Sequence, residues 1–289
     1  MPQRSATARS KTITFEVSAK VRALRDVGAI LKGKSGSALM ANAFGAELKK
    51  WRGVRHLSQL DLALASNVSA RHIAFIETGR ANPSRAMVLQ LCTALDIPRR
   101  ERNALLEKAG FASAYRARPL SDADLAPVRQ AVAWTLERHE PFPAFAVDRH
   151  WVLVALNGPA ARLLGTVGLG VGDSLLDAVA GGGALQSAIE NYAEVASHMR
   201  TRLATEIRHL GGDPVLEAAI ARFGSILPDT LKVEPTLMIP TVFRAAGQRL
   251  SLLSTIAQFG TVDDIAISEL RIELLFPADE ATRAVFMGA

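Results

Sequence analysis

The sequence predicts a mainly α-helical protein with two domains: a five-helix N-terminal domain of helix-turn-helix type and a C-terminal α+β domain. Its 289 residues leave room for two domains, since one domain takes roughly 100–200 residues. Residues 1–39 hold 8 Lys or Arg against 2 Asp or Glu, residues 40–118 hold 13 against 6, and residues 119–289 hold 13 against 20. The net charges are therefore +6, +7 and −7. A basic N-terminal part and an acidic C-terminal part indicate different partners for the two.

The first 39 residues are rich in Ser, Thr, Ala, Lys and Arg, and "KGKSGS" at 32–37 predicts a break in order. Two interpretations remain open. The segment is either a basic arm that touches phosphates or a poorly ordered leader, in which case Met40 can be the true start. We favour the leader.

Residues 40–114 predict a compact helical domain. Phe44, Leu48 and Trp51 share one face of a first helix, and Met87, Leu91 and Leu95 follow one another at spacings of four in a later one. A last helix begins near Pro98 and ends at Gly110. Five helices joined by short turns form a small α-domain. The linker is placed at residues 115–125, where the composition and the charge change.

Two helix starts in this domain carry the same capping pattern. Ser58 with Asp61 three residues later predicts a capping box, and Ser69 predicts a second N-cap. Asn67 between the helices tolerates a positive φ, and Gly79 stands where a left-handed C-terminal residue belongs. Two short helices held by a tight turn form a helix-turn-helix.

In such a motif the second helix enters the DNA major groove with its N-terminal residues against the bases. Arg71 can pair with guanine, and Phe75 can touch a thymine methyl group. Gln59 can hold a phosphate. The alternative is that Arg71 is a solvated charge and Phe75 packs on the neighbouring helix. The remaining candidates, at the start of the second helix or beside the DNA backbone, are Ser69, Ala70, Arg80, Arg85, Lys49, Lys50 and Arg52.

Residues 126–289 predict an α+β domain with a helix over 126–139, two early strands, central helices and three late strands. This content can enclose an apolar pocket with a few polar anchors. Arg202 or Arg208 can hold a carboxylate head group. For each apolar candidate, ordinary core packing is the competing explanation. The pocket candidates are Phe145, Trp151, Leu153, Tyr192, Met199, Arg202, Arg208, His209, Leu252 and Phe259.

Several classes of protein are disfavoured. The single cysteine, Cys92, lies in an apolar helical pattern, which excludes a disulfide framework and fits a reducing cytosol. The histidines show no metal-ligand spacing, so neither a metal nor a cofactor is expected. "GLGVGD" at 168–173 does not match the dinucleotide-binding pattern, and we expect no enzyme activity. No apolar run is long enough for a membrane span, so we expect a cytoplasmic protein without a membrane partner.

The segment "SQLDLALASNVSARHIAFIETGRANPSRAMVLQL" resembles the Cro/C1-type (XRE) helix-turn-helix of phage repressors and bacterial regulators. The Gln at the start of the first motif helix and "IETGR" after the second carry the likeness. Further on, "PFPAFAVDRHWVLVALNGPAARLL" and "STIAQFGTVDDIAISELRIELLFPADEAT" resemble the MmyB-like ligand-binding domain. This resemblance implies a PAS-like fold and binding of a fatty acid.

Together these observations favour a transcription regulator that binds a double-stranded operator as a homodimer and senses a small apolar or amphipathic effector. The rival hypothesis is an antitoxin-like module whose helix pair docks on a protein. A degenerate enzyme that uses the C-terminal pocket is a further alternative.

Overall fold

The computed structural model describes residues 34–226, 238–260 and 263–288. Almost all of the predicted basic leader lies outside these residues. The first helix, α1 (Lys34–Val54), begins inside "KGKSGS", so the break predicted over 32–37 is wrong from residue 34 onward. Ser and Gly each weaken a helix by no more than about 1 kcal/mol, and the "ALMANA" run that follows favours the helix.

The five predicted N-terminal helices are confirmed. After α1 come α2 (Gln59–Ser66), α3 (Ala70–Glu77), α4 (Arg85–Ala94) and α5 (Arg99–Lys108). They enclose one cluster of buried apolar side chains. Burial raises the pKa of the Cys92 thiol to about 12, which agrees with its expected place in the core. The cluster includes Phe44, Leu48, Trp51, Leu62, Ile73, Ile76, Val88, Leu91, Cys92, Leu105 and Leu106.

The turn between α2 and α3 has the predicted geometry. Ser58 and Asp61 form the complete capping box, and the Ser69 hydroxyl accepts the amide of His72. Asn67 ends α2 in the left-handed region at φ 51°, and Gly79 follows α3 at φ 71°. A Cβ at Gly45 would lie 2.3 Å from the carbonyl oxygen of Ile76. The backbones of α1 and α3 therefore pack closely, which fixes the position of α3.

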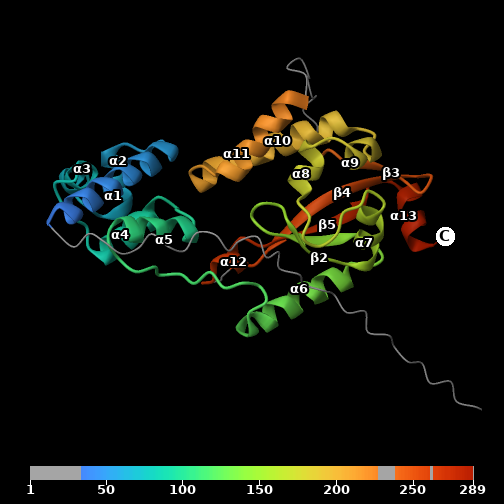
Figure 1. Cartoon of the computed structure of the whole chain (residues 1–289), viewed down its shortest axis with the longest axis horizontal. Coiled ribbons are helices and arrows are strands. Elements are labelled where there is room, and N and C mark those ends of the chain that lie inside the picture. The colour runs from blue at the N-terminus through green and yellow to red at the C-terminus, as the bar shows by residue number, and fades with distance from the viewer. Residues whose placement is uncertain (1–33, 227–237, 261–262, 289) are drawn as a thin grey trace, which may run out of the picture.

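The C-terminal domain is built on an antiparallel sheet with the strand order β2-β1-β5-β4-β3. Its strands are β1 (Ala144–Val147), β2 (Leu153–Leu156), β3 (Thr241–Ala245), β4 (Gln248–Gln258) and β5 (Arg271–Pro277). The α+β prediction is confirmed, including the two early strands and the three late ones. Figure 1 shows this domain at one end of the molecule and the five N-terminal helices at the other.

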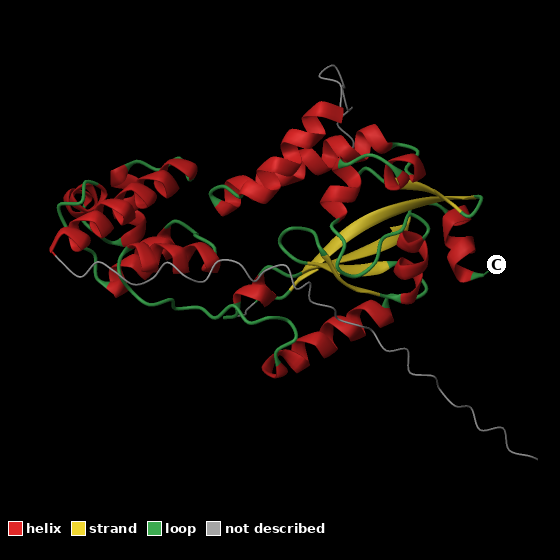
Figure 2. Ribbon diagram, in the orientation of Figure 1, coloured by secondary structure: helices red, strands yellow, loops and turns green. Residues whose placement is uncertain are grey.

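Helices cover both faces of the sheet (Figure 2). Phe145 and Val147 of β1 belong to a core cluster with the helices between β2 and β3, whereas Ala144 and Ala146 belong to a second cluster with α6. This alternation follows from the two-residue period of a strand. The helices are α6 (Ala126–Arg138), α7 (Gly158–Gly165), α8 (Leu175–Ala180), α9 (Ala184–Ala188), α10 (Tyr192–Leu210), α11 (Pro214–Ile226), α12 (Ile265–Ser268) and α13 (Glu280–Met287), with a short 3-10 turn, η1 (Ala123–Leu125), before α6.

Candidate functional site

The exposed part of α3 is its first turn. Ile73 and Ile76 are fully buried, while Ser69 and Arg71 are exposed. Ala70 is half-buried and packs against the core cluster, so it contributes less free surface than predicted. Figure 1 shows α3 at the end of the N-terminal domain that lies away from the sheet. The turn that was predicted to meet DNA bases is therefore accessible from outside the molecule.

Phe75 lies next to Arg71 on this surface. The Arg71 guanidinium stands over the Phe75 ring, with its carbon 5.3 Å from the ring centroid. Phe75 is half-buried and is not part of the core cluster of the N-terminal domain. This position favours the interpretation of Phe75 as a surface residue over packing on a neighbouring helix. The ring also limits the orientations that Arg71 adopts, through a cation–π contact.

A buried carboxylate ties α3 to the rest of the domain. Glu77, at the end of α3, accepts hydrogen bonds from Nε and Nη2 of Arg52 at 2.7 and 2.9 Å, and from the Gln59 amide at 2.8 Å. Burial raises the pKa of Glu77, but the hydrogen bonds from Arg52 and Gln59 outweigh it, and the net pKa is lowered. The Arg52 side chain is 15% exposed and also donates to the carbonyl of Leu57. The sequence analysis did not predict a role for Glu77. An acidic residue at the end of the second motif helix of a basic domain could have indicated such an internal ion pair.

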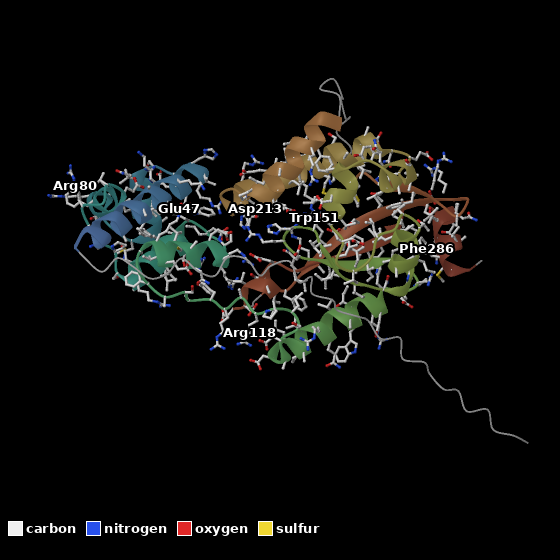
Figure 3. All side chains as sticks on the ribbon, in the orientation of Figure 1. Glu47, Arg80, Arg118, Trp151, Asp213 and Phe286 are labelled. Carbon is white, nitrogen blue, oxygen red and sulfur yellow. The ribbon has the colours of Figure 1, made fainter. Side chains whose placement is uncertain are left out.

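This network changes the predicted set of phosphate contacts. Arg52 is not available to a phosphate, because its guanidinium already binds Glu77 and the carbonyl of Leu57. Gln59 is the first residue of α2, as predicted, but its side-chain amide donates a hydrogen bond to Glu77. Of the predicted phosphate contacts, those with exposed side chains are Lys49, Lys50, Arg80 and Arg85. Figure 3 shows Arg80 at the outer end of the domain.

The C-terminal domain contains a cavity of about 360 Å³ between the sheet and the helices from α7 to α10. Four of the ten predicted residues line it: Phe145, Trp151, Met199 and Arg202. Sequence reasoning missed most of its lining. The missed residues include Leu163, Leu164, Leu175, Leu185, His198, Thr241, Phe243, Ser254 and Glu273.

The other six predicted residues lie elsewhere. Leu153, Tyr192 and Leu252 are buried in the core behind the cavity, where the Tyr192 hydroxyl donates to the carbonyl of Val179. Phe259 packs in the cluster beneath α6, on the opposite face of the sheet. Arg208 and His209 are exposed at the far end of α10. Arg208 is therefore not placed to hold a ligand in this cavity.

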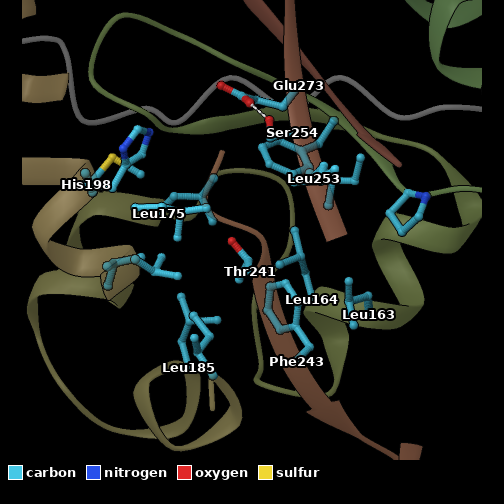
Figure 4. Close-up of a pocket in the computed structure, with 18 of the residues that line it drawn as sticks. Leu163, Leu164, Leu175, Leu185, His198, Thr241, Phe243, Leu253, Ser254 and Glu273 are labelled. Atoms are coloured by element: carbon cyan, nitrogen blue, oxygen red, sulfur yellow. Dashed lines mark hydrogen bonds between the residues drawn. The ribbon is translucent and has the colours of Figure 1, made fainter. Parts of the chain in front are cut away.

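One end of the cavity is polar (Figure 4). Glu273 of β5 is buried, and its carboxylate accepts a hydrogen bond from Nη2 of Arg202 at 2.8 Å and another from the hydroxyl of Ser254. The Arg202 guanidinium carbon also lies 4.2 Å from the centroid of a Trp151 ring. Arg202 reaches the cavity as predicted, but it does so as the partner of a buried carboxylate.

Comparison with known proteins identifies both domains. Residues 128–287, more than half of the chain, match the family model of the MmyB-like transcription regulator ligand binding domain. The chain belongs to the MmyB-like transcription regulator family. Residues 43–105 match a helix-turn-helix domain model. Both domain identities that the sequence suggested are thereby confirmed.

A solved structure is similar to part of this regulator. It is the restriction-modification controller protein C.AhdI from Aeromonas hydrophila, 37% identical, which covers 22% of this chain and 94% of its own, with a TM-score of 0.21. No curated protein matches the chain. Within residues 34–226, 238–260 and 263–288, no helix has the length and apolar character of a membrane span, and no cluster of three or more His, Cys, Asp or Glu suited to a metal is found.

The two domains of the regulator meet at a buried arginine. Arg149, in the turn between β1 and β2, binds Asp213 at 2.6 Å, Glu269 at 2.9 Å and Glu101 of α5 at 3.2 Å. We call these four residues the interdomain joint. Burial raises the pKa of Asp213, but hydrogen bonds from Arg149 and the Leu216 amide outweigh it, so the net pKa is lowered. Burial raises the pKa of Glu101 despite the nearby Arg149.

A second contact joins α1 to the end of α10. Arg55 donates hydrogen bonds to the carbonyls of Leu95 at 2.8 Å and of His209 at 3.0 Å. Gly211, directly after α10, lies so close to the Trp51 ring that a Cβ there would approach it to 2.6 Å. Helix α10, which lines the cavity, therefore also contacts the helix-turn-helix domain. No sequence pattern indicated this contact.

Proposed function

We propose that this regulator binds a specific DNA operator through the first turn of α3 and that a small apolar or amphipathic effector in the C-terminal cavity changes its affinity for that operator. The observation that carries the proposal is the capped α2–α3 pair with an exposed Arg71, joined in one chain to an apolar cavity. We place this action in the cytoplasm. We assign the cavity to binding, without catalysis.

The DNA side of the proposal follows the Cro/C1-type (XRE) resemblance. One reading helix covers only a half-site, so we propose a homodimer on a pseudopalindromic operator. Arg71, Phe75 and Ser69 would meet base edges, while Lys49, Lys50, Arg80 and Arg85 would meet phosphates. The free backbone amides at the N-terminus of α2, which begins at Gln59, would also contact a phosphate.

Replacing Arg71 with alanine is expected to weaken binding to the operator by about 1–3 kcal/mol and to leave binding to unrelated DNA nearly unchanged, since a base contact is lost. Arg85→Ala should weaken both equally and reduce the salt dependence, because a phosphate contact is lost. The test is fluorescence anisotropy with the intergenic DNA beside the gene and unrelated DNA of equal length. Arg138→Ala, on α6 in the other domain, is the control. Equal losses on both DNAs for Arg71→Ala would reject base recognition.

The effector side rests on the cavity and the strand order β2-β1-β5-β4-β3, which supports a PAS-like fold. Most of the cavity is lined by aliphatic and aromatic side chains, the usual lining of a small-molecule site. A fatty acid is one amphiphile that such a cavity can take. Met238 and Ile256 are 51% and 48% exposed at its edge, so the cavity is reachable from solvent.

Two elements connect the cavity with the DNA-binding domain. The turn between β1 and β2 carries Trp151 into the cavity and Arg149 into the interdomain joint. Helix α10 carries Met199 and Arg202 at the cavity and ends at the carbonyl bound by Arg55. Trp151 has φ 63°, an unfavourable conformation for a bulky residue. We propose that a ligand which moves Trp151 or α10 shifts the balance between two arrangements of the domains.

A protein partner is the second candidate function, and one observation favours it. Leu60 and Leu64 lie one turn apart on α2 and are 61% and 76% exposed. Such a pair suits a protein contact better than a DNA backbone. An antitoxin-like role predicts weak salt dependence and no preference between DNA sequences, whereas phosphate contacts give a steep salt slope. The anisotropy experiment above, repeated over a salt series, separates the two.

A further inference from the structure

A second and larger cavity, of about 680 Å³, lies between the two domains. Arg99 and Arg102 of α5 line it on one side, and Arg202, Glu206 and Arg271 of the C-terminal domain line it on the other. We call it the interdomain cleft. Unlike the apolar cavity beside it, the cleft is lined largely by charged and polar side chains. A ligand in the cleft would touch both domains.

The interdomain cleft adjoins the apolar cavity. Ile256 of β4 and Arg202 of α10 line both spaces. On β5, Glu273 lines the cavity and Arg271 lines the cleft, and residues two positions apart lie on the same face of a strand. Ile256 is 48% exposed, so the cavity is open to solvent where it borders the cleft. A ligand whose chain fills the cavity can therefore place its head group in the cleft.

Three of the five arginines that line the cleft are engaged by carboxylates. Glu206 binds Arg271 at 2.7 Å and Arg202 at 3.4 Å. Glu269 binds Arg149 at 2.9 Å. These ion pairs leave little charge on this side of the cleft for a ligand.

The other two arginines, Arg99 and Arg102, lie one turn apart on α5 and are half-buried. Neither forms an ion pair with a residue that the structure describes. Arg99 stands over the Tyr115 ring at 5.8 Å, and Arg102 donates to the Tyr115 hydroxyl at 3.2 Å. The remaining titratable lining residues, Asp96 and His209, are exposed, and solvent screens the charge of Asp96. The α5 side of the cleft therefore keeps positive charge for an anionic group.

Size and chemistry together indicate the kind of head group. The cleft is larger than the cavity of about 360 Å³, so a single carboxylate would occupy only a small part of it. Arginine binds phosphate groups through paired, charge-assisted hydrogen bonds. Two arginines at adjacent turns of one helix suit a head group that carries more than one negative charge.

We propose that the effector is an amphiphile with an aliphatic chain in the apolar cavity and a large, phosphate-bearing head group in the interdomain cleft, where Arg99 and Arg102 bind it. This inference rests on the proposed effector-binding function of the cavity. A free fatty acid fits the cavity as well, but its carboxylate does not extend across the cleft to α5. The head group would connect the effector directly with the helix-turn-helix domain.

The test uses four probes: decanoate, decanoyl-coenzyme A, 1-decanoyl-glycerol 3-phosphate, and coenzyme A without a chain. Isothermal titration calorimetry with the full-length protein at neutral pH gives each dissociation constant. Decanoyl-coenzyme A is expected to bind about ten times tighter than decanoate, since a hydrogen bond between charged groups contributes about that much. The glycerol phosphate, with its small head group, is expected to bind with an affinity between those two. Coenzyme A alone should bind more weakly than its decanoyl ester.

Three results would count against the inference. Decanoyl-coenzyme A that binds no tighter than decanoate would overturn it and leave the proposed effector site intact, and so would tighter binding of the glycerol phosphate than of decanoyl-coenzyme A. Equal binding of coenzyme A and its decanoyl ester would also overturn it, because the chain would then contribute nothing. Failure of every probe with a chain to bind would overturn both the inference and the proposed effector site.

A variant checks the role of Arg99 itself. Arg99→Gln removes the charge and should weaken decanoyl-coenzyme A binding about ten-fold while leaving decanoate binding unchanged, since decanoate does not reach α5. Arg138→Gln, at an exposed position on α6, is the matched control and should change neither affinity. Decanoyl-coenzyme A binding that stays the same in Arg99→Gln would contradict the assignment. The comparison of probes on the wild-type protein decides the case if that variant does not fold.

Discussion

Replacing Glu77 with alanine is expected to destabilise the N-terminal domain by about 3–5 kcal/mol, because removal of one partner leaves a buried charge unpaired. The Glu77 side chain is 3% exposed, and the side chain of Arg52, which it binds, is 15% exposed. Gln59 would lose its hydrogen-bond partner as well. These contacts hold the end of α3 against α1 and the start of α2. Without them α3 should lose its fixed position, and operator binding should fail as a result.

Hydrogen exchange followed by mass spectrometry measures this effect in the intact chain. Amides of α1 and α3 should lose most of their protection in Glu77→Ala, while those of the sheet should keep it. Glu47→Ala is the matched control, since Glu47 pairs with Lys50 and Lys108 at the surface and such pairs contribute about 0–1 kcal/mol. Protection of α3 that survives in Glu77→Ala would show that the carboxylate does not anchor this helix.

Replacing Arg149 with alanine is expected to uncouple DNA binding by the N-terminal domain from effector binding in the C-terminal domain. Its side chain is 10% exposed and binds Glu101, Asp213 and Glu269 together, so its removal takes a shared partner from three carboxylates. The expected loss is about 3–5 kcal/mol at the joint, by the same reasoning as for Glu77. DNA binding by the N-terminal domain should persist, because its core and α3 lie away from Arg149. The response of that binding to effector should be lost.

Operator affinity measured with and without a saturating effector tests this prediction. Arg100→Ala is the control, because Arg100 binds the same Glu269 but is 46% exposed, and a pair of that kind contributes little. The response to effector should survive in Arg100→Ala. A normal response in Arg149→Ala would show that the signal takes another path, of which the contact of Arg55 with α10 is the strongest remaining candidate.

The sequence predicts this fold well where the determinants are local. The capping box at Ser58, the cap at Ser69 and the left-handed Asn67 are written within a few neighbouring residues, and the structure contains each of them. The periodicity of Phe44, Leu48 and Trp51 likewise needs only one helix. These features determine the helix pair and with it the candidate DNA surface.

Residues that act across long sequence separations were predicted poorly. Arg52 and Glu77 are 25 positions apart, and Arg149 meets Glu269 across 120 positions, so neither pair shows in local spacing. The cavity has the same difficulty. On β4, Leu252 is buried in the core while Ser254 and Ile256 line the cavity, and only the folded sheet distinguishes these positions. Charge alone also misled the assignment of Arg52, because a basic domain still needs buried ion pairs.

The most direct test of a ligand-responsive regulator is the operator affinity of the full-length protein with and without a saturating amphiphile such as decanoate. Fluorescence anisotropy with labelled operator DNA at a fixed salt concentration gives both dissociation constants. We predict that they differ by about 5–150-fold, the usual range of coupling between two sites, and that the difference disappears in Arg149→Ala. Equal dissociation constants with the cavity saturated would contradict the coupling of the two domains.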